Sequence, residues 1–433
     1  MLPRLWSFFG RAPRDRSTSR RLHELAPLPA SLVVTALRFT TAGESHGPAL
    51  VCILEGMPAG LPLTAAAIDH DLARRQQGYG RGRRMQIEKD QVELLSGVRA
   101  GTTIGSPIAM LIANRDWKNW QEIMDPAASD ADPAPRRRSV TRPRPGHADL
   151  SGMLKYDRAD ARDILERASA RETTARVAAG AVCRNLLQQF GVRIASHVVH
   201  LGGIDPARPD PLPDDINAVA DASPLRTLDP SADARIIERI DSIKRDGNTL
   251  GGIAEVVCDG VPVGLGSHVS WDRKLDGRIA AAMMSIPAVK AVEIGLGFEA
   301  ARRTGAEAHD EIDLEPGRPL TGNVRRRTNR AGGLEGGITT GEPLVIRVGM
   351  KPISTLMRPL TTIDVATGEP ASAVAERSDV TAVPAMAVIA EAMLAFVLAH
   401  AFVEKFGGDS LDEMRRNYDG YLSAIGARIV PVA

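Results

Sequence analysis

The sequence has few aromatic residues and almost no excess of charge. Aromatic side chains make up 4% of the 433 residues, which argues against the aromatic platforms on which nucleic-acid bases stack. The 54 lysines and arginines nearly cancel the 53 acidic residues, so the net charge is +1. A chain this close to neutrality is not a general binder of nucleic acids or membrane surfaces. Any electrostatic function must therefore come from local clusters of charge.

Cysteines are scarce and long hydrophobic runs are rare. Cys52, Cys183 and Cys258 each lie in an apolar run and form no C-x-x-C pair, which predicts buried thiols in a reducing compartment. The one span long enough to suggest a membrane helix, 382–403, contains a proline, a histidine and Glu391. Because ionisable groups are costly in lipid, we predict a buried core helix and no membrane span.

The first 36 residues differ from the rest of the chain. They carry six arginines against two acidic residues. An Arg-rich, acid-poor stretch is consistent with an organelle-targeting segment, which would make the protein organellar. We favour a disordered leader or a misplaced start, and therefore a cytoplasmic protein.

Two short motifs occur twice, in the same order. Residues 55–61 match 259–265, an offset of 204, and both copies follow a β-type apolar run. Residues 101–107 resemble 337–343, an offset of 236, and both copies precede such a run. Glycines and prolines in these motifs set turn geometry, so they indicate structure first. Two matches in order predict two related halves, each built as strand–turn–helix–strand.

The repeat predicts an α+β fold of two similar halves, and we expect residues 37–422 to form a single catalytic domain. Its halves cover about 37–200 and 250–355, followed by a helical region at 380–422. Residues 423–433 are expected to form a tail. The Pro-rich stretches 126–145 and 206–230 read as long surface connections.

The first arginine-rich segment, 74–84, runs from a predicted helix end into a glycine-rich loop. The helix dipole explains arginines at that end but not the density of guanidiniums beyond it. Such density suits a polyanionic small molecule. Gly78 and Gly80 lack the third glycine and the preceding strand of a dinucleotide fingerprint, so we reject that motif.

The second segment, 136–149, begins as a run of arginines and ends in Pro-Gly-His147-Ala-Asp149. A charge run of this kind is ordinarily a solvated surface. His147 differs because a turn precedes it and an aspartate follows it, which suits an imidazole oriented for proton transfer. A structural role for this histidine is the alternative.

The third segment spans residues 167–172. Ser169 and Glu172 have the spacing of a capping box, which predicts a helix that includes 177–187. Free N–H groups, the helix dipole and the two arginines of the segment together favour a phosphate at this end.

Three further segments carry polar chemistry. A compact Gly-flanked loop, 43–47, presents His46, and residues 351–355 combine a lysine with hydroxyls and backbone amides in an anion cradle. Asp379 follows an arginine and a serine ahead of the apolar helix. The loop at 43–47 does not match the G-x-S-x-G motif of hydrolases. His197 and His200 fall on opposite faces of a predicted strand, so we predict no metal site.

These segments resemble one family. RFTTAGESHG at 38–47, RASARET at 167–173 and RSDVTAVPA at 377–385 are similar to the three signature regions of chorismate synthases. PGHAD, TNRAGGLEGG and KPIST, which start at positions 145, 328 and 351, resemble the family too. The resemblance covers about 37–422 and implies a β-α-β sandwich with internal repetition, assembled as a homotetramer.

The resemblance also implies an activity. Family members convert 5-enolpyruvylshikimate 3-phosphate to chorismate and phosphate, and they need reduced FMN although the reaction is redox-neutral. NADPH or a separate flavin reductase is the implied source of electrons. By motif position, His46 acts as an acid near the departing phosphate, and His147 protonates the reduced flavin. Asp379 works with the flavin to remove the ring proton.

The implied binding residues fall into two groups. The FMN contacts are Arg167, Ala168, Ser169, Pro287, Ala288, Gly336, Lys351, Pro352, Ile353, Ser354, Thr355 and Arg377. Contacts to the substrate or NADP are Arg75, Arg81 and Arg171.

Two other classes of protein stay open at this point. A flavin-dependent oxidoreductase would use the same cradle with NADPH, and would consume reductant at every turnover. A nucleic-acid-binding protein would use the loop 136–144, but the low aromatic content and neutral charge weigh against it.

Overall fold

The computed structural model describes residues 37–82, 87–127, 138–375 and 379–429. The leader predicted for 1–36 and the end of the predicted tail lie outside these ranges. The described chain from residue 37 onward belongs to a single compact unit. The last helix, α11 (Leu411–Gly426), continues past residue 422 into the region predicted as a tail.

The first half of the chain builds a four-stranded antiparallel sheet with the order β1-β2-β6-β3. Inward-facing residues of β2 and β6 are buried and alternate with more exposed ones, as expected for a sheet packed on one face. The helix α1 (Ala65–Gln76) follows β2 and is capped by Thr64, whose side chain accepts from the amide of Ala67. The strands are β1 (Arg38–Ala42), β2 (Ala49–Glu55), β3 (Val92–Leu94) and β6 (Ile108–Ala113).

The second half repeats this topology. Its sheet has the order β7-β8-β14-β9, again antiparallel, and the helix α8 (Leu275–Met284) follows β8 as α1 follows β2. The strands are β7 (Arg193–Leu201), β8 (Gly252–Asp259), β9 (Val289–Ile294) and β14 (Leu344–Met350).

The strand register confirms the internal repeat. Leu54 pairs with Ile108 in the first sheet, and Cys258 pairs with Leu344 in the second. These partners are related by the same two offsets that relate the sequence motifs. Adding one offset to each partner of the pair in the first sheet gives the two partners of the pair in the second sheet. The motifs therefore mark equivalent positions of two similar halves.

A threonine fixes the same turn in both halves. The Thr103 hydroxyl donates to the carbonyl of Pro58 and accepts from the amide of Leu61, at 2.6 and 2.9 Å. The Thr339 hydroxyl makes the corresponding contacts to Pro262 and Leu265, at 2.6 and 2.8 Å. Each threonine thus satisfies buried backbone groups of a Pro-Gly turn that would otherwise be unpaired.

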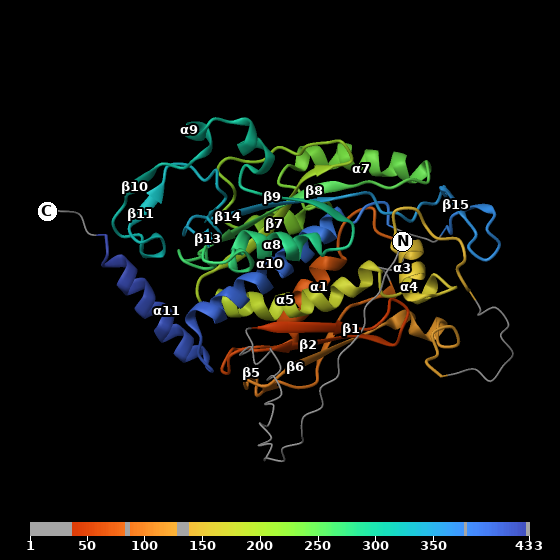
Figure 1. Ribbon diagram of the computed structural model, residues 1–433, viewed down its shortest axis with the longest axis horizontal. Coiled ribbons are helices and arrows are strands. Elements are labelled where there is room, and N and C mark those ends of the chain that lie inside the picture. Colours follow the sequence, from red (N-terminus) through yellow and green to blue (C-terminus); the bar gives the residue numbers. More distant parts are fainter. Residues whose placement is uncertain (1–36, 83–86, 128–137, 376–378, 430–433) are drawn as a thin grey trace, which may run out of the picture. The chain divides into compact units, whose positions relative to one another are not determined.

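The helices α1, α5 (Thr173–Gln188), α8 and α10 (Val383–Phe406) lie between the two sheets, so the fold is the predicted β-α-β sandwich (Figure 1). The helix α5 packs on β2 and β6, and the long helix α10 packs on β7 and β8. These helices also pack on each other, where Gly180 allows close approach: a Cβ there would lie 2.4 Å from the Cβ of Ala392.

The helix α10 is long and apolar enough to cross a membrane, but 83% of its most apolar window is buried inside the protein. This burial agrees with the predicted core helix. The three cysteines are free and buried, as predicted, and burial raises the pKa of Cys52 to about 12.

The remaining elements are short and lie around the sandwich. The other helices are α3 (Asp149–Tyr156), α4 (Arg162–Leu165), α6 (Ile216–Ala222), α7 (Pro230–Arg245) and α9 (Gly305–Ala308). Small hairpins pair β4 (Val98–Arg99) with β5 (Thr102–Thr103), β10 (Ile312–Leu314) with β11 (Val324–Arg326), β12 (Leu334–Glu335) with β13 (Ile338–Thr339), and β15 (Thr361–Ile363) with β16 (Pro370–Ser372). Short 3-10 helices cover Arg115–Asn119, Ala170–Glu172, Trp271–Arg273, Gly297–Arg302 and Pro319–Thr321.

Two local predictions were wrong. The stretch 206–230 is not wholly a loop, because it contains α6, which is capped by Asp215. The capping box is not formed either: a 3-10 turn intervenes, and Ser169 accepts from the amide of Arg171. Glu172 therefore precedes α5 instead of sitting in its first turn, and its carboxylate accepts from Arg176 at 2.9 Å.

Candidate active site

Loops and helix ends from both halves enclose a cavity of about 520 Å³. Its lining comes from the β1–β2 loop, the end of α1, the loop before α3, the start of α5, the α8–β9 loop, the segment after β14 and the start of α10. These segments are far apart in the sequence. The volume is within the range of small-molecule sites.

His46 is held on its edge and on its ring face. Both oxygens of the Glu166 carboxylate lie 2.9 Å from Nδ1, and the amide of His46 donates to the same carboxylate at 2.9 Å. The imidazole stacks on Trp120 with ring centroids 3.8 Å apart. Burial opposes ionisation of Glu166, but hydrogen bonds from His46 and Arg162 outweigh it and lower the pKa of Glu166. The carboxylate is thus an ionised acceptor.

His147 has a carboxylate partner of its own. Its Nδ1 lies 2.5 Å from Oδ1 of Asp149, which is fully buried at the start of α3. Burial opposes ionisation of Asp149, but hydrogen bonds from His147 and Arg144 outweigh it and hold its pKa well below its usual range. Because a carboxylate only accepts, Nδ1 of His147 carries a proton. Arg144 Nη2, which lies 3.1 Å from that nitrogen, donates to Oδ1 of Asp149 at 3.1 Å.

The α1 and α10 ends meet at Asp379. Its Oδ2 pairs with Arg81 Nε at 2.8 Å, and its Oδ1 accepts from the amide of Gly82 at 2.5 Å. Arg75, at the end of α1, donates to the hydroxyl of Thr173 and to the carbonyl of Ala170. The contacts of Asp379 hold the loop after α1 near the start of α10, and those of Arg75 join the end of α1 to the start of α5.

Arg75 is a buried cation that shares a carboxylate partner with a second arginine. The Asp90 carboxylate lies 3.5 Å from Arg75 Nη1 and also pairs with Arg171. Burial lowers the pKa of Arg75 to about 9; Asp90 opposes this effect, whereas the nearby Arg81 and Arg171 add to it. The guanidinium is still charged at neutral pH. A bound anion would therefore offset the cost of burying this charge and its repulsion from other arginines.

One wall of the cavity follows β14. Lys351 donates to the carbonyl of Gly146 at 2.8 Å, which ties this segment to the loop that carries His147. The Thr355 hydroxyl accepts from Arg144 at 2.8 Å. Apolar side chains complete the wall: Leu165, Ile286, Met350, Met386 and Ile389.

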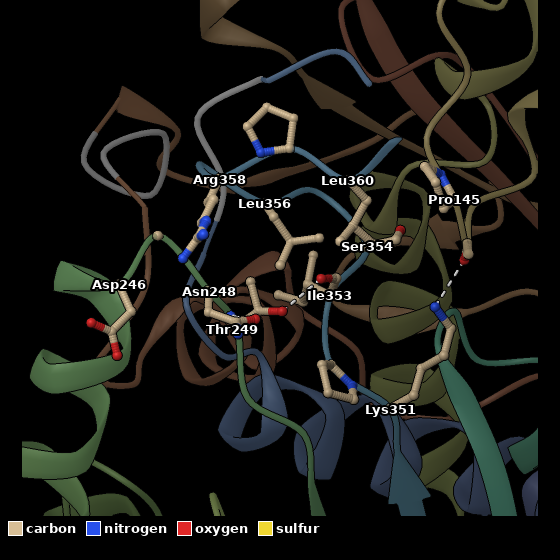
Figure 2. Close-up of a pocket in the computed structure, with 14 residues that line it drawn as sticks. Pro145, Asp246, Asn248, Thr249, Lys351, Ile353, Ser354, Leu356, Arg358 and Leu360 are labelled. Atoms are coloured by element: carbon tan, nitrogen blue, oxygen red, sulfur yellow. Dashed lines mark hydrogen bonds between the residues drawn. The ribbon is translucent and has the colours of Figure 1, made fainter. Parts of the chain in front are cut away.

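A second, more open pocket of about 770 Å³ lies on the other side of the same segment (Figure 2). It shares Gly146, Lys351, Ile353 and Ser354 with the cavity. In Figure 2 the Lys351 side chain reaches across to the loop after Pro145, and a hydrogen bond links Thr249 to the Ile353 carbonyl at 2.7 Å. The segment after β14 therefore lines both the cavity and this outer pocket.

The structure brings most of the predicted site residues together. Those that line the cavity are His46, Arg75, Arg81, His147, Ala168, Ser169, Pro287, Ala288, Lys351, Ile353, Ser354, Thr355 and Asp379. Among the described residues of the lining, four are cationic side chains (Arg75, Arg81, Arg144 and Lys351) and Asp379 is the one carboxylate. The lining is therefore strongly electropositive, although the whole chain is nearly neutral.

Five predicted residues do not belong to the described lining. Arg167 donates to the carbonyls of Gly43 and Thr41 at 3.0 and 2.9 Å. Arg171 pairs with Asp90 at 2.5 Å and donates to Asn114 at 2.9 Å. The other three are Pro352, which lines the outer pocket, Gly336, in the β12–β13 turn, and Arg377, which lies outside the described residues.

Sequence reasoning missed three residues that hold the histidines. Arg144 was grouped with a solvated charge run, yet it is 8% exposed and bridges Asp149 and Thr355. Glu166 and Trp120 were not singled out at all. The one available signal was the position of Glu166 directly before the Arg-Ala-Ser motif. The described residues contain no group of three or more His, Cys, Asp and Glu arranged for a metal.

Comparisons with known proteins point to one family. The family model for chorismate synthase matches residues 37–403. A chorismate synthase of Symbiobacterium thermophilum is 58% identical over 90% of this chain and 100% of its own length. One of Geobacter metallireducens is 58% identical over 89% of this chain and 98% of its own length. A crystal structure of chorismate synthase superposes with a TM-score of 0.73 at 45% identity, covering 91% of this chain and 99% of that one.

The chain matches these proteins over nearly their whole length, and its electropositive cavity holds two imidazoles. It is therefore a carbon–oxygen lyase that acts on phosphates. Within that class it belongs to the chorismate synthase family, which serves the shikimate pathway. Its substrate is a small molecule, and the predicted fold is confirmed.

Proposed function

We propose that this chain eliminates phosphate from 5-enolpyruvylshikimate 3-phosphate to give chorismate, the last step of the shikimate pathway. The reaction requires reduced FMN and causes no net redox change. The observation that carries the proposal is the convergence of two carboxylate-held imidazoles and four cationic side chains on one cavity.

The charge of the cavity suits these ligands. The substrate brings one phosphate and two carboxylates, and FMN brings a second phosphate. Arg75 supports the proposal most directly, because it is buried and poorly neutralised in the protein alone. Anions bound near Arg75, Arg81 and Lys351 would form charge-assisted hydrogen bonds in a site of low dielectric.

The described residues fit a flavin. Ala168, Ser169 and Ala288 offer backbone and hydroxyl groups, Lys351 offers a charge for the phosphate, and apolar side chains such as Met386 offer a surface for the ring. When bound, reduced FMN supplies electron density to the electron-poor centre left by the departing phosphate and recovers it afterwards. The protein contributes orientation, charge and exclusion of water.

Two groups of this chain would move protons in the elimination. The C–O bond to phosphate and one ring C–H bond break, and a second conjugated double bond forms, so electrons balance without an external oxidant. His46 would supply a proton to the departing phosphate, and Asp379 would take the proton from the ring beside the site that would hold the flavin. His147, with its Nδ1 proton donated to Asp149, holds a proton toward the flavin through its other nitrogen.

We propose that the enzyme is a cytoplasmic homotetramer that obtains reduced flavin with NADPH or from a separate reductase. Exposed apolar side chains support association, since Trp271 is 86% and Phe298 71% exposed in the single chain. Such surfaces on isolated chains are commonly covered by a partner copy.

Anaerobic incubation with chemically reduced FMN and 5-enolpyruvylshikimate 3-phosphate tests the function. We expect phosphate and chorismate in equal amounts, over many turnovers, from one initial reduction of the flavin. Consumption of one reductant per product would instead show a flavin-dependent oxidoreductase. Oxidised FMN serves as the control and is expected to give no product.

Calorimetry tests whether flavin and substrate share the cavity. We expect FMN to bind more tightly when the substrate is present, because each ligand shields the other from water and their anions engage different cations of the lining. Identical FMN affinity with and without the substrate would contradict a common cavity.

A further inference from the structure

The loop that carries His46 is clasped by the segment that connects α4 to α5. The amide of Ser45 donates to the carbonyl of Glu166 at 2.9 Å, and the Ser169 hydroxyl donates to that of Ser45 at 3.1 Å. Arg167 donates to the carbonyls of Gly43 and Thr41. The loop is thus held on both sides of Glu44, at Gly43 and at Ser45. This places Nδ1 of His46 beside the Glu166 carboxylate.

The carboxylate of Glu166 decides which ring nitrogen of His46 carries a proton. Its side chain is 2% exposed, and Arg162 Nη1 donates to its Oε1 at 3.0 Å. An ionised carboxylate can only accept hydrogen bonds. Because both of its oxygens lie 2.9 Å from His46 Nδ1, a hydrogen bond forms when that nitrogen carries the proton.

The ring of His46 also has little freedom to turn. Trp120 stacks on it at an interplanar angle of 21°. Trp120 is itself held by the guanidiniums of Arg138 and Arg162, which lie 4.6 and 5.1 Å from its ring centroid. A 180° flip of the imidazole would put the Cδ2 carbon in the place of Nδ1 and break the contact to Glu166. The edge and face contacts therefore support the same orientation.

We propose that Glu166 is a positioning residue that holds His46 as the Nδ1–H tautomer, so that Nε2 is the nitrogen that exchanges the catalytic proton. The role of His46 in this inference rests on the proposed function. Carboxylates act in this way on the general base of serine hydrolases, where they fix the tautomer and orientation of the imidazole.

Nitrogen-15 NMR of histidine side chains tests the tautomer directly. The experiment uses the full-length protein labelled at its nine histidines, without substrate or flavin, well above the usual imidazole pKa of about 6.5. The His46→Gln variant assigns the signals. We expect a protonated Nδ1 and an unprotonated Nε2 for His46. A predominant Nε2–H tautomer would overturn the proposal, and this test does not depend on any variant of Glu166 folding.

Glu166→Gln tests the consequence for turnover, because an amide presents a donor as well as an acceptor to Nδ1. We expect a mixture of tautomers, and a kcat about 10²–10⁴ lower with KM changed less than about threefold. Unchanged kcat, or a retained Nδ1–H tautomer, would overturn the proposal. Glu172→Gln is the matched control, since this carboxylate lies in the same segment but pairs with Arg176.

The two arms separate this inference from the proposed function. Failure of the wild-type protein to release phosphate would refute the function but leave the tautomer measurement standing. An active wild-type enzyme with the Nε2–H tautomer would refute only the role of Glu166.

Discussion

Removing the charge of Glu391 is expected to destabilise the helix layer severely. This carboxylate is fully buried in the middle of α10. It accepts from Arg74 at 2.9 and 3.0 Å, from Arg184 at 2.6 Å, from Arg226 at 3.2 Å and from the Ser196 hydroxyl at 2.5 Å. Three arginines from different parts of the chain therefore share this anion. Asp71 and Asp221 are their other carboxylate partners.

The magnitude follows from what the substitution leaves behind. Glu391→Gln keeps the volume of the side chain but leaves Arg74, Arg184 and Arg226 with less negative charge in a buried setting. Deleting one partner of a buried ion pair costs about 3–5 kcal/mol when the remaining charge has neither water nor a counter-charge. Asp71 and Asp221 still pair with the three arginines, so we expect a loss near the lower end of this range in the free energy of unfolding at neutral pH.

The pH dependence gives an independent check. Burial opposes ionisation of Glu391, but Arg74, Arg184 and Arg226 outweigh it and hold its pKa well below its usual range. A group with a depressed pKa in the folded state stabilises the protein above its unfolded pKa of about 4.3. That contribution is lost as the pH falls from there toward the folded-state pKa. The difference between wild type and variant should therefore shrink below about pH 4.

Guanidinium denaturation followed by circular dichroism and tryptophan fluorescence measures the difference. Glu404→Gln, on the same helix, is the control: Glu404 is 31% exposed and pairs with Arg278 at 2.6 Å. Such a pair contributes about 0–1 kcal/mol. A loss below about 1 kcal/mol for Glu391→Gln, or one equal to that of the control, would refute the reasoning.

Two further predictions concern catalysis and packing. His46→Ala and His147→Ala should each lower kcat by about 10²–10⁴ in a phosphate-release assay while the circular dichroism spectrum is unchanged. His200→Ala, outside the cavity lining, should leave kcat near wild type. Gly180→Ala should cost about 1–3 kcal/mol on chemical denaturation, because its Cβ would lie 2.4 Å from that of Ala392. Gly426→Ala in α11 meets nothing within 4 Å and should not destabilise; equal effects at the two glycines would contradict the packing argument.

The repeated architecture was readable from the sequence because turn chemistry is local. The Pro-Gly motifs near residues 58 and 262 require the same tight turns in both halves, and the apolar runs beside them have the length of strands. The pairing of Leu54 with Ile108 and of Cys258 with Leu344 then follows the sequence offsets. The predicted residues that line the cavity were found for a related reason, since family motifs mark them one by one.

The direction of each guanidinium was not readable in this way. Arg75 and Arg171 come from similar arginine-rich segments. Arg75 nevertheless lines the cavity, whereas Arg171 lies outside the lining and pairs with Asp90. Arg167 stands in the family motif but donates to carbonyls of the first strand and its loop. A guanidinium turns toward whichever acceptor the fold brings near, and that acceptor is set by packing.

The amino-acid sequence by itself determined two related halves, the helix that fills the layer between them, and the segments that gather at one site. Only the tertiary structure decided which charges face the cavity and which carboxylate holds each imidazole. Glu166 and His46 are 120 residues apart, and Glu391 meets Arg74 across 317 residues. Strand and turn preferences act over a few residues, whereas the partner of a buried charge is chosen by contacts between distant parts of the folded chain.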